Sequence, residues 1–244
     1  MTVEVPDDGP VRTVTLRRPP ANALTAVEYT ALRETFIAPS DGVRVVVLRG
    51  DGASFCAGQD LAEARSLTPA QIDPHLLLAG SAVAAAAWSP LPLVTAVGGP
   101  AVGTGALLVA LADVVVMADG AWLSFPEAGY GMPVGLSLLA RYVPARYVPA
   151  RTARRLLATG GPTGAGELAA LGAVDHLVAA EQLDRATDTA VQQLLGLSPA
   201  MAAWLFAGPE RASREADYLA EVRAAADAQA WHFERATRPA RGAG

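Results

Sequence analysis

The sequence predicts an α/β fold with a helical C-terminal region. Strand-like and helix-like patterns alternate up to about residue 180, and only helical patterns follow. Two strand-length runs, Val43–Leu48 and Leu91–Val97, are almost entirely apolar, as in a parallel sheet that is buried on both faces. With 52% hydrophobic residues, many of them alanine, the chain can form a large core with closely packed helices. We therefore expect a core domain over residues 1–180 and a helical region over residues 181–244.

The N-terminal segment predicts a hairpin followed by a helix. Apolar and polar residues alternate in Val3–Val5 and Val11–Leu16, and a turn of Asp, Gly and Pro lies between them. Thr25 and Glu28 have the spacing of a capping box, in which each side chain accepts a backbone hydrogen bond. This pattern predicts a helix from Thr25 to about Ile37.

Two glycine-bearing turns follow apolar strands. Gly50–Leu61 comes after Val43–Leu48 and leads into a short helix near Asp60, and Gly98–Gly105 comes after Leu91–Val97. In one parallel sheet such turns can converge, and their backbone N–H groups can hold a phosphate or a carbonyl oxygen that becomes negative. The residues alone leave both possibilities open.

The rest of the chain predicts mostly helices. Residues 141–150 repeat Arg-Tyr-Val-Pro-Ala twice, and because each proline removes a helical hydrogen bond we expect a loop or kink there. A turn is expected at Gly160–Gly164. The other predicted helices are Thr68–Trp88, Ala106–Ala112, one that begins at Ser137–Leu139, Thr152–Thr159, Ala165–Leu171, Glu181–Leu195, Pro199–Phe206 and Pro209–Arg235, and the other predicted strands are Val114–Met117 and Val174–Val178.

The composition excludes several functional classes. A net charge of −5 provides no basic surface for nucleic acid, and the absence of lysine excludes Schiff-base chemistry and a P-loop lysine. Cys56 is the single cysteine, so no internal disulfide forms, and no Cys/His spacing suggests a metal site. No apolar run is long enough to span a membrane, and the first residues lack a secretion signal. We expect a cytoplasmic protein that binds neither membranes nor metals.

Glu127 lies one predicted strand after the second glycine turn and can therefore approach it. An acid near a helix start often only complements the helix dipole. Partial desolvation beside Phe125 would instead raise its pKa and suit it to proton transfer. Gly103-Thr104-Gly105 also begins a dinucleotide fingerprint, but Leu108 stands where the third glycine belongs, which disfavours a nucleotide-dependent oxidoreductase.

The other candidate groups for chemistry lack supporting motifs. His75, His176 and His232 are scattered, which predicts surface or core histidines. No serine has the nucleophile-elbow pattern of a hydrolase. Cys56 lies in a loop without an obvious base, so we interpret it as a small buried apolar residue.

Nine segments, taken in order, resemble the crotonase (enoyl-CoA hydratase/isomerase) superfamily. The most specific is the Phe-Cys-Ala-Gly-x-Asp-Leu block, and the match covers nearly the whole chain. The segments are Arg18–Leu24, Val43–Gly50, Ser54–Leu61, Pro92–Val97, Gly103–Gly105, Ala112–Asp113, Phe125–Glu127, Thr159–Gly160 and Ala169–Asp175.

The resemblance implies a crotonase-like spiral of ββα units, followed by a C-terminal helical region for trimerisation. It also implies a homotrimer or a dimer of trimers. The substrate would be an acyl-CoA thioester, with no cofactor beyond the coenzyme A that is part of it.

The resemblance also assigns site residues. It implies that Glu127 is the catalytic acid/base and that the backbone N–H groups of Gln59 and Thr104 form the oxyanion hole. The residues that it places at the substrate are Ala57, Gly58, Asp60, Leu61, Gly103 and Leu107.

Two departures from the family pattern bear on the reaction. The second glutamate of the family's hydratases falls on Leu107, which cannot transfer a proton, and Thr104 replaces a usual glycine. Hydration needs one group to activate water and another to protonate carbon, whereas one carboxylate is enough to move a proton between two carbons. We therefore expect isomerase-type chemistry, with a non-catalytic acyl-CoA binding protein as the alternative.

Overall fold

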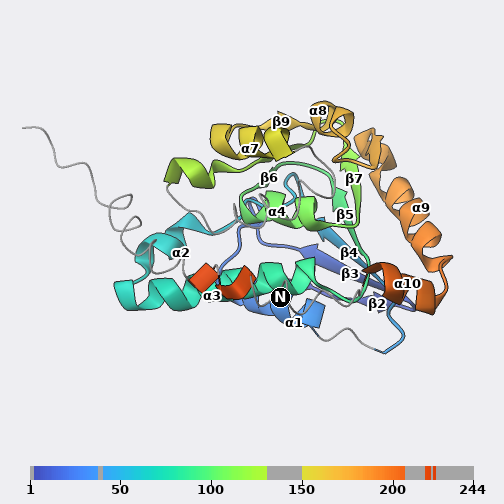
Figure 1. Cartoon of the computed structure of the whole chain (residues 1–244), viewed down its shortest axis with the longest axis horizontal. Helices are drawn as coiled ribbons and strands as arrows, with labels where there is room; N and C mark the ends of the chain where they lie inside the picture. Colours follow the sequence, from blue (N-terminus) through green and yellow to red (C-terminus); the bar gives the residue numbers. More distant parts are fainter. Residues whose placement is uncertain (1–2, 38–40, 131–149, 207–217, 221, 224–244) are drawn as a thin grey trace, which may run out of the picture.

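The computed structural model describes residues 3–37, 41–130, 150–206, 218–220 and 222–223. Its centre is a seven-stranded sheet in the order β1-β3-β4-β5-β7-β10, with β2 paired to β3. A separate three-stranded sheet has the order β6-β8-β9 (Figure 1). The strands are β1 Val3–Glu4, β2 Asp7–Asp8, β3 Val11–Leu16, β4 Val45–Gly50, β5 Leu93–Val97, β6 Ala101–Val102, β7 Val114–Ala118, β8 Trp122–Ser124, β9 Thr163–Gly164 and β10 His176–Val178.

Helices surround these sheets. The short 3-10 helices are η1 Pro126–Tyr130 and η2 Ala180–Gln182. The α-helices are α1 Ala26–Ile37, α2 Leu61–Ser66, α3 Pro69–Ala87, α4 Thr104–Leu111, α7 Ala150–Thr159, α8 Ala165–Ala170, α9 Leu183–Leu195 and α10 Pro199–Phe206.

Both faces of the main sheet are covered, as its apolar strands predict. From β3 through β4, β5 and β7 to β10 the strands run parallel. Because side chains alternate between faces, Val46 and Leu48 of β4 join the core that includes α1 and α3, while Val45 and Val47 pack with α9. Figure 1 shows α1 and α3 on one side of the sheet and α9 on the other.

The predicted N-terminal hairpin and capped helix are confirmed, except that Asp7 and Asp8, expected in the turn, form β2 and pair with β3. β1 pairs antiparallel with β3, and the Thr25 amide donates to Glu28 Oε2 at 2.8 Å as the capping box requires. The next strand begins two residues later than the predicted Val43. There the amides of Arg44 and Val45 both donate to the carbonyl oxygen of Pro10, so the chain enters the ladder only at Val45.

The small sheet was not predicted. β6 lies inside the segment interpreted as a glycine turn, and β9 lies inside the predicted turn Gly160–Gly164. β6 pairs parallel with β8, which pairs antiparallel with β9. Strands of two or three residues are too short to show a period-2 pattern, so the turn residues dominated the prediction.

Some predictions lie outside the described residues. These are the helix at Ser137–Leu139, almost all of the Arg-Tyr-Val-Pro-Ala repeat, and most of the helix Pro209–Arg235. The last residue of the repeat, Ala150, begins α7.

Candidate active site

The two glycine turns interlock at the carboxyl ends of β4 and β5. The amide of Phe55 donates to the carbonyl of Pro100 at 3.0 Å, and the amide of Val102 donates to the carbonyl of Cys56 at 2.8 Å. A Cβ on Gly105 would lie 2.3 Å from the Cys56 oxygen, so this approach requires glycine. The turns therefore converge, as their positions after parallel strands predict.

Asn22 holds the first turn in place. It is 2% exposed and has a positive φ of 55°, a conformation that asparagine tolerates better than most residues. Its side-chain amide donates to the carbonyls of Asp51 and Ser54 at 2.9 Å each, and its oxygen accepts from the Arg18 amide at 2.8 Å. The turn is thus fixed from within the molecule before any ligand binds.

The amides of Gln59 and Thr104 lie where the two turns meet. Gly58 has a φ of 76°, and a Cβ there would lie 2.5 Å from the Val102 oxygen and 3.1 Å from the Thr104 nitrogen. Thr104 opens α4, so its N–H has no acceptor within the helix. Within the described part of the chain, neither the Gln59 nor the Thr104 amide donates to another residue. Two backbone donors therefore remain available at one cavity.

Glu127 reaches the same place from η1. The Gly103 amide donates to the Ser124 carbonyl at 2.9 Å, which joins the second turn to the end of β8. A Cβ on Gly103 would lie 3.1 Å from Glu127 Oε1, so the carboxylate rests against this glycine. Its other oxygen, Oε2, is buried without a hydrogen-bond partner among the described residues. Burial raises the pKa of Glu127, and its own backbone N–H offsets part of that shift.

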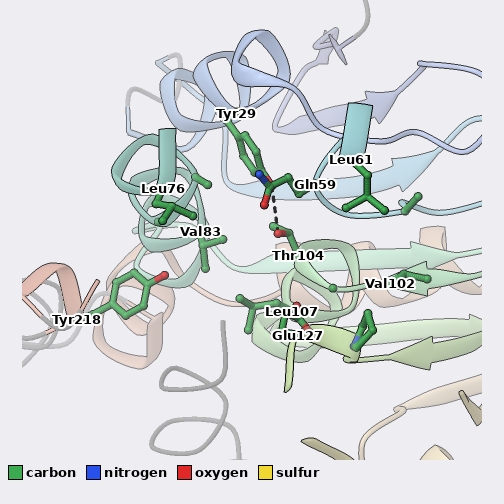
Figure 2. A pocket seen from close by; sticks show the side chains of 15 residues that line it. Tyr29, Gln59, Leu61, Leu76, Val83, Val102, Thr104, Leu107, Glu127 and Tyr218 are labelled. Carbon is green, nitrogen blue, oxygen red and sulfur yellow. Dashed lines mark hydrogen bonds between the residues drawn. The ribbon is translucent and has the colours of Figure 1, made fainter. Parts of the chain in front are cut away.

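These groups line a cavity of about 190 Å³. Figure 2 shows Tyr29, Thr104 and Glu127 around it, with Leu76 and Val83 of α3 along the opposite wall. The lining residues are Tyr29, Ala57, Gln59, Leu61, Leu76, Ala79, Gly80, Val83, Val102, Gly103, Thr104, Leu107, Pro126, Glu127 and Tyr218.

Most of the predicted site residues meet at this cavity. The catalytic candidate Glu127 and the donor candidates Gln59 and Thr104 line it together. Of the residues predicted to bind substrate, the cavity lining contains Ala57, Leu61, Gly103 and Leu107.

Gly58 and Asp60 are placed differently, because neither belongs to the cavity lining. Gly58 allows the close approach of the turns, as described above. Asp60 caps α2 by accepting from the amides of Ala62 and Glu63 at 2.9 Å each, and it pairs with Arg18 at 2.7 Å. These backbone hydrogen bonds and the Arg18 charge lower the pKa of Asp60. The structure thus gives both residues architectural roles.

Leu107 makes the wall beside Glu127 apolar. It lies one turn along α4 from Thr104, on the same helix face, and is 2% exposed. Among the described residues of the lining, the titratable side chains are Glu127, Tyr29 and Tyr218. Burial raises the pKa of the Tyr29 phenol, so at neutral pH this group stays protonated.

The sequence did not predict that Tyr29, Tyr218 and the α3 residues line the cavity. Tyr29, Leu32 and Phe36 are spaced as one buried helix face, which by itself indicates core packing. The α3 residues from Leu76 to Val83 also recur on one face, but the pattern does not reveal that this face borders a cavity.

The predictions for Cys56 and His75 are confirmed. Cys56 is fully buried, and burial raises the pKa of its thiol to about 12. His75 is 6% exposed and packs edge-on against the Tyr29 ring, with centroids 5.9 Å apart. Burial lowers the His75 pKa, which favours the neutral imidazole.

Two further properties concern only the described ranges. Within them, no group of three or more His, Cys, Asp or Glu side chains is arranged to hold a metal ion. None of their helices combines the length and the apolar character needed to cross a membrane.

The chain is similar to known proteins over most of its length. The family model described as enoyl-CoA hydratase/isomerase matches residues 8–237. A (7aS)-7a-methyl-1,5-dioxo-2,3,5,6,7,7a-hexahydro-1H-indene-carboxyl-CoA hydrolase of Rhodococcus jostii is 34% identical over 182 residues, which cover 73% of this chain and 68% of the relative. The Mycobacterium tuberculosis protein "Probable enoyl-CoA hydratase echA6" is 36% identical over 124 residues. The match covers 50% of this chain and 49% of that relative, so it spans about half the length of the relative.

A Thermobifida fusca protein solved in complex with CoA has the same fold. It superposes with a TM-score of 0.75 at 26% identity, over 93% of each chain. This agreement over nearly the whole length confirms the predicted α/β architecture.

Proposed function

Because the chain belongs to the enoyl-CoA hydratase/isomerase family, we propose that it acts on an acyl-CoA thioester, with Glu127 as its single acid/base. The observation that carries the proposal is the meeting of the Gln59 and Thr104 amides with the Glu127 carboxyl at one cavity. Coenzyme A enters as part of the substrate, and no other cofactor is needed. The CoA complex of the Thermobifida fusca neighbour supports this substrate class.

The two amides hold the thioester oxygen. When a proton leaves the α-carbon, negative charge moves to this oxygen, and two fixed donors stabilise the enolate more strongly than the neutral thioester. Neither amide has another acceptor in the described chain, so both are free there to donate to a ligand.

Glu127 moves the proton. Its carboxylate removes a proton from the α-carbon of a 3-enoyl thioester, which leaves a dienolate, and the resulting carboxylic acid then protonates the γ-carbon. The double bond moves to the 2,3 position and Glu127 returns to its starting state. A raised pKa favours this role, because the carboxyl must both accept and return a proton.

Leu107 favours isomerisation over hydration. Addition of water requires a group that activates the water while another protonates carbon. Leu107 occupies the position of the second acid with an apolar side chain that is 2% exposed. A single carboxyl is sufficient for a proton shift within the substrate.

The test compares wild type with Glu127→Gln on 3-enoyl-CoA and 2-enoyl-CoA substrates. We expect isomerisation by wild type, loss of turnover on the order of 10²- to 10⁴-fold in Glu127→Gln, and unchanged affinity for butyryl-CoA by calorimetry. Fast hydration of crotonyl-CoA by wild type would contradict the isomerase assignment. Binding without turnover in both proteins would instead indicate an acyl-CoA binding protein, which the apolar Leu107 also permits.

We further propose that the chain assembles as a homotrimer or a dimer of trimers. In α10, Met201, Trp204 and Leu205 are exposed, and Trp204 is 75% exposed. Such large apolar side chains on one short helix favour burial against another subunit. Light scattering coupled to size-exclusion chromatography measures the mass, and a monomer would contradict the proposal.

A further inference from the structure

The hydroxyl groups of Tyr29 and Thr104 form a pair inside the cavity. The Tyr29 and Thr104 oxygens are 3.2 Å apart, and Figure 2 shows this contact between α1 and the start of α4. Tyr29 is 1% exposed, and its ring is packed edge-on by His75. The phenol therefore occupies a fixed position.

The pair has one O–H group more than it can use internally. Each hydroxyl carries one donor hydrogen, and only one of the two can be donated across the pair. Within the described chain, neither Tyr29 nor Thr104 makes another side-chain hydrogen bond. One O–H is thus left without an acceptor among the described residues, in a pair whose Tyr29 member is buried.

Glu127, an acceptor in the same cavity, makes no hydrogen bond to either hydroxyl in the described chain. A ligand oxygen can therefore accept from the spare O–H. The rest of the lining offers few polar groups, because α3 contributes Leu76, Ala79, Gly80 and Val83 and α4 contributes Leu107. In the proposed function, the thioester oxygen already receives the N–H groups of Gln59 and Thr104, which match the two lone pairs of a carbonyl. A second oxygen, elsewhere on the acyl group, is left to accept from the pair.

We propose that Tyr29 and Thr104 determine specificity for acyl-CoA thioesters whose acyl group carries a hydroxyl or keto oxygen. This inference rests on the proposed function, because it assumes that the thioester occupies this cavity. An acyl group without such an oxygen leaves the O–H unpaired, and a site built to hydrogen-bond a ligand discriminates against the analogue that lacks the partner.

The experiment compares the affinities of butyryl-CoA, 3-hydroxybutyryl-CoA and 4-hydroxybutyryl-CoA by calorimetry. For wild type we expect at least one hydroxylated thioester to bind about tenfold or more tightly than butyryl-CoA, the range of one buried hydrogen bond. The double variant Tyr29→Phe/Thr104→Val removes both O–H groups and retains the Thr104 amide, and it should lose this preference. Thr104→Ser keeps a hydroxyl and should preserve it.

Absence of a preference in wild type, or its persistence in the double variant, would overturn the inference. If the double variant does not fold, as judged by its melting temperature, the single variants decide, because at least one of them removes the hydroxyl that faces the ligand. Butyryl-CoA separates the two proposals. If it binds without any preference for the hydroxylated forms, only the specificity inference fails, whereas no binding of any thioester contradicts the proposed function as well.

Discussion

The two walls of the cavity are built in different ways. On one wall, two interlocked turns present the backbone donors of the proposed oxyanion hole. Glycines allow an approach so close that a Cβ at Gly58 or Gly105 would lie 2.5 Å or less from a backbone oxygen. On the other, α3 presents apolar side chains such as Leu76 and Val83 from a regular helix. The turn wall leaves no space for even a methyl group at these two glycines. At the helix wall, the space available depends on the size of the side chains.

Under the proposed function, the two walls should respond differently to substitution. Backbone donors cannot be replaced by changing a side chain, so substitutions affect them only through the geometry of the turns. Side chains on α3 can change volume while the helix stays in place. Substitutions on the turn wall should therefore affect turnover, and those on the helix wall should affect which acyl groups fit.

Among the substitutions that compare the two walls, the largest effect is expected for Gly58→Ala. Its methyl group would meet the Val102 oxygen at 2.5 Å and the Thr104 nitrogen at 3.1 Å, so the turns must separate and both donors move. We expect turnover to fall on the order of 100-fold or more, as when an oxyanion donor is lost. Steady-state kinetics on the proposed 3-enoyl-CoA substrate measures the change.

Gly52→Ala is the matched control. Gly52 has a similar φ of 79°, but nothing lies within 4 Å of the position that a Cβ would occupy. This substitution carries only the backbone strain, roughly 1–2 kcal/mol of stability, and should leave turnover nearly unchanged. Equal loss of activity in the two variants would show that strain, and not the approach of the turns, is responsible.

The difference between the walls also explains what the sequence could predict. The turns were recognisable because glycines follow apolar strands, and the same pattern predicted that they converge. Tyr29 was not recognisable, because its spacing with Leu32 and Phe36 is that of any buried helix face. Whether such a face meets other side chains or a cavity depends on the packing of α1 against α3, which is a tertiary property.

The short strands of the small sheet could not be predicted for a related reason. β6 has two residues, and it exists because Ala101 pairs with Leu123 and forms a bridge with Cys56 across the turns. Its stability comes from partners distant in sequence, so local glycine and proline signals outweighed it. Asp60 shows the opposite case. The predicted start of a short helix near this residue is confirmed, because Asp60 caps α2 through local hydrogen bonds.

The second prediction tests whether the apolar residue opposite the acid limits the reaction. Leu107→Glu restores a second carboxyl, and we expect crotonyl-CoA hydration to rise by about tenfold or more, because a second proton-transfer group becomes available. Burying it at a position that is 2% exposed should lower stability by about 2–5 kcal/mol. Leu107→Gln introduces a side chain of nearly the same shape as glutamate but without an acid. Equal hydration by the two variants would contradict the explanation that a missing second acid limits hydration.

The third prediction concerns the helix wall. Val83→Ala enlarges the cavity at a position that is 4% exposed and should reduce stability by about 2 kcal/mol. We expect KM for longer acyl chains to fall a few-fold, about 1 kcal/mol per added methylene accommodated, with little change in kcat. Val47→Ala, on the sheet face that packs with α9, loses the same methyl groups away from the cavity. It should lower stability without changing the preference for acyl-chain length. If KM for longer acyl chains falls equally in both variants, the α3 wall does not set that preference.

The smallest effect is expected in the pH dependence of stability. Burial raises the pKa of Glu127 in the folded state above its unfolded value, so folding favours the protonated form. Its stabilising contribution is complete below the unfolded pKa and is lost as the pH rises through the folded pKa. Glu127→Gln keeps a neutral side chain at every pH. Its melting temperature should therefore match that of wild type near about pH 4 and exceed it increasingly toward about pH 8. A difference that is greatest at acidic pH would mean that the carboxylate is stabilised in the folded protein, and Glu127 would then lack the raised proton affinity that sets the turn wall apart from the helix wall.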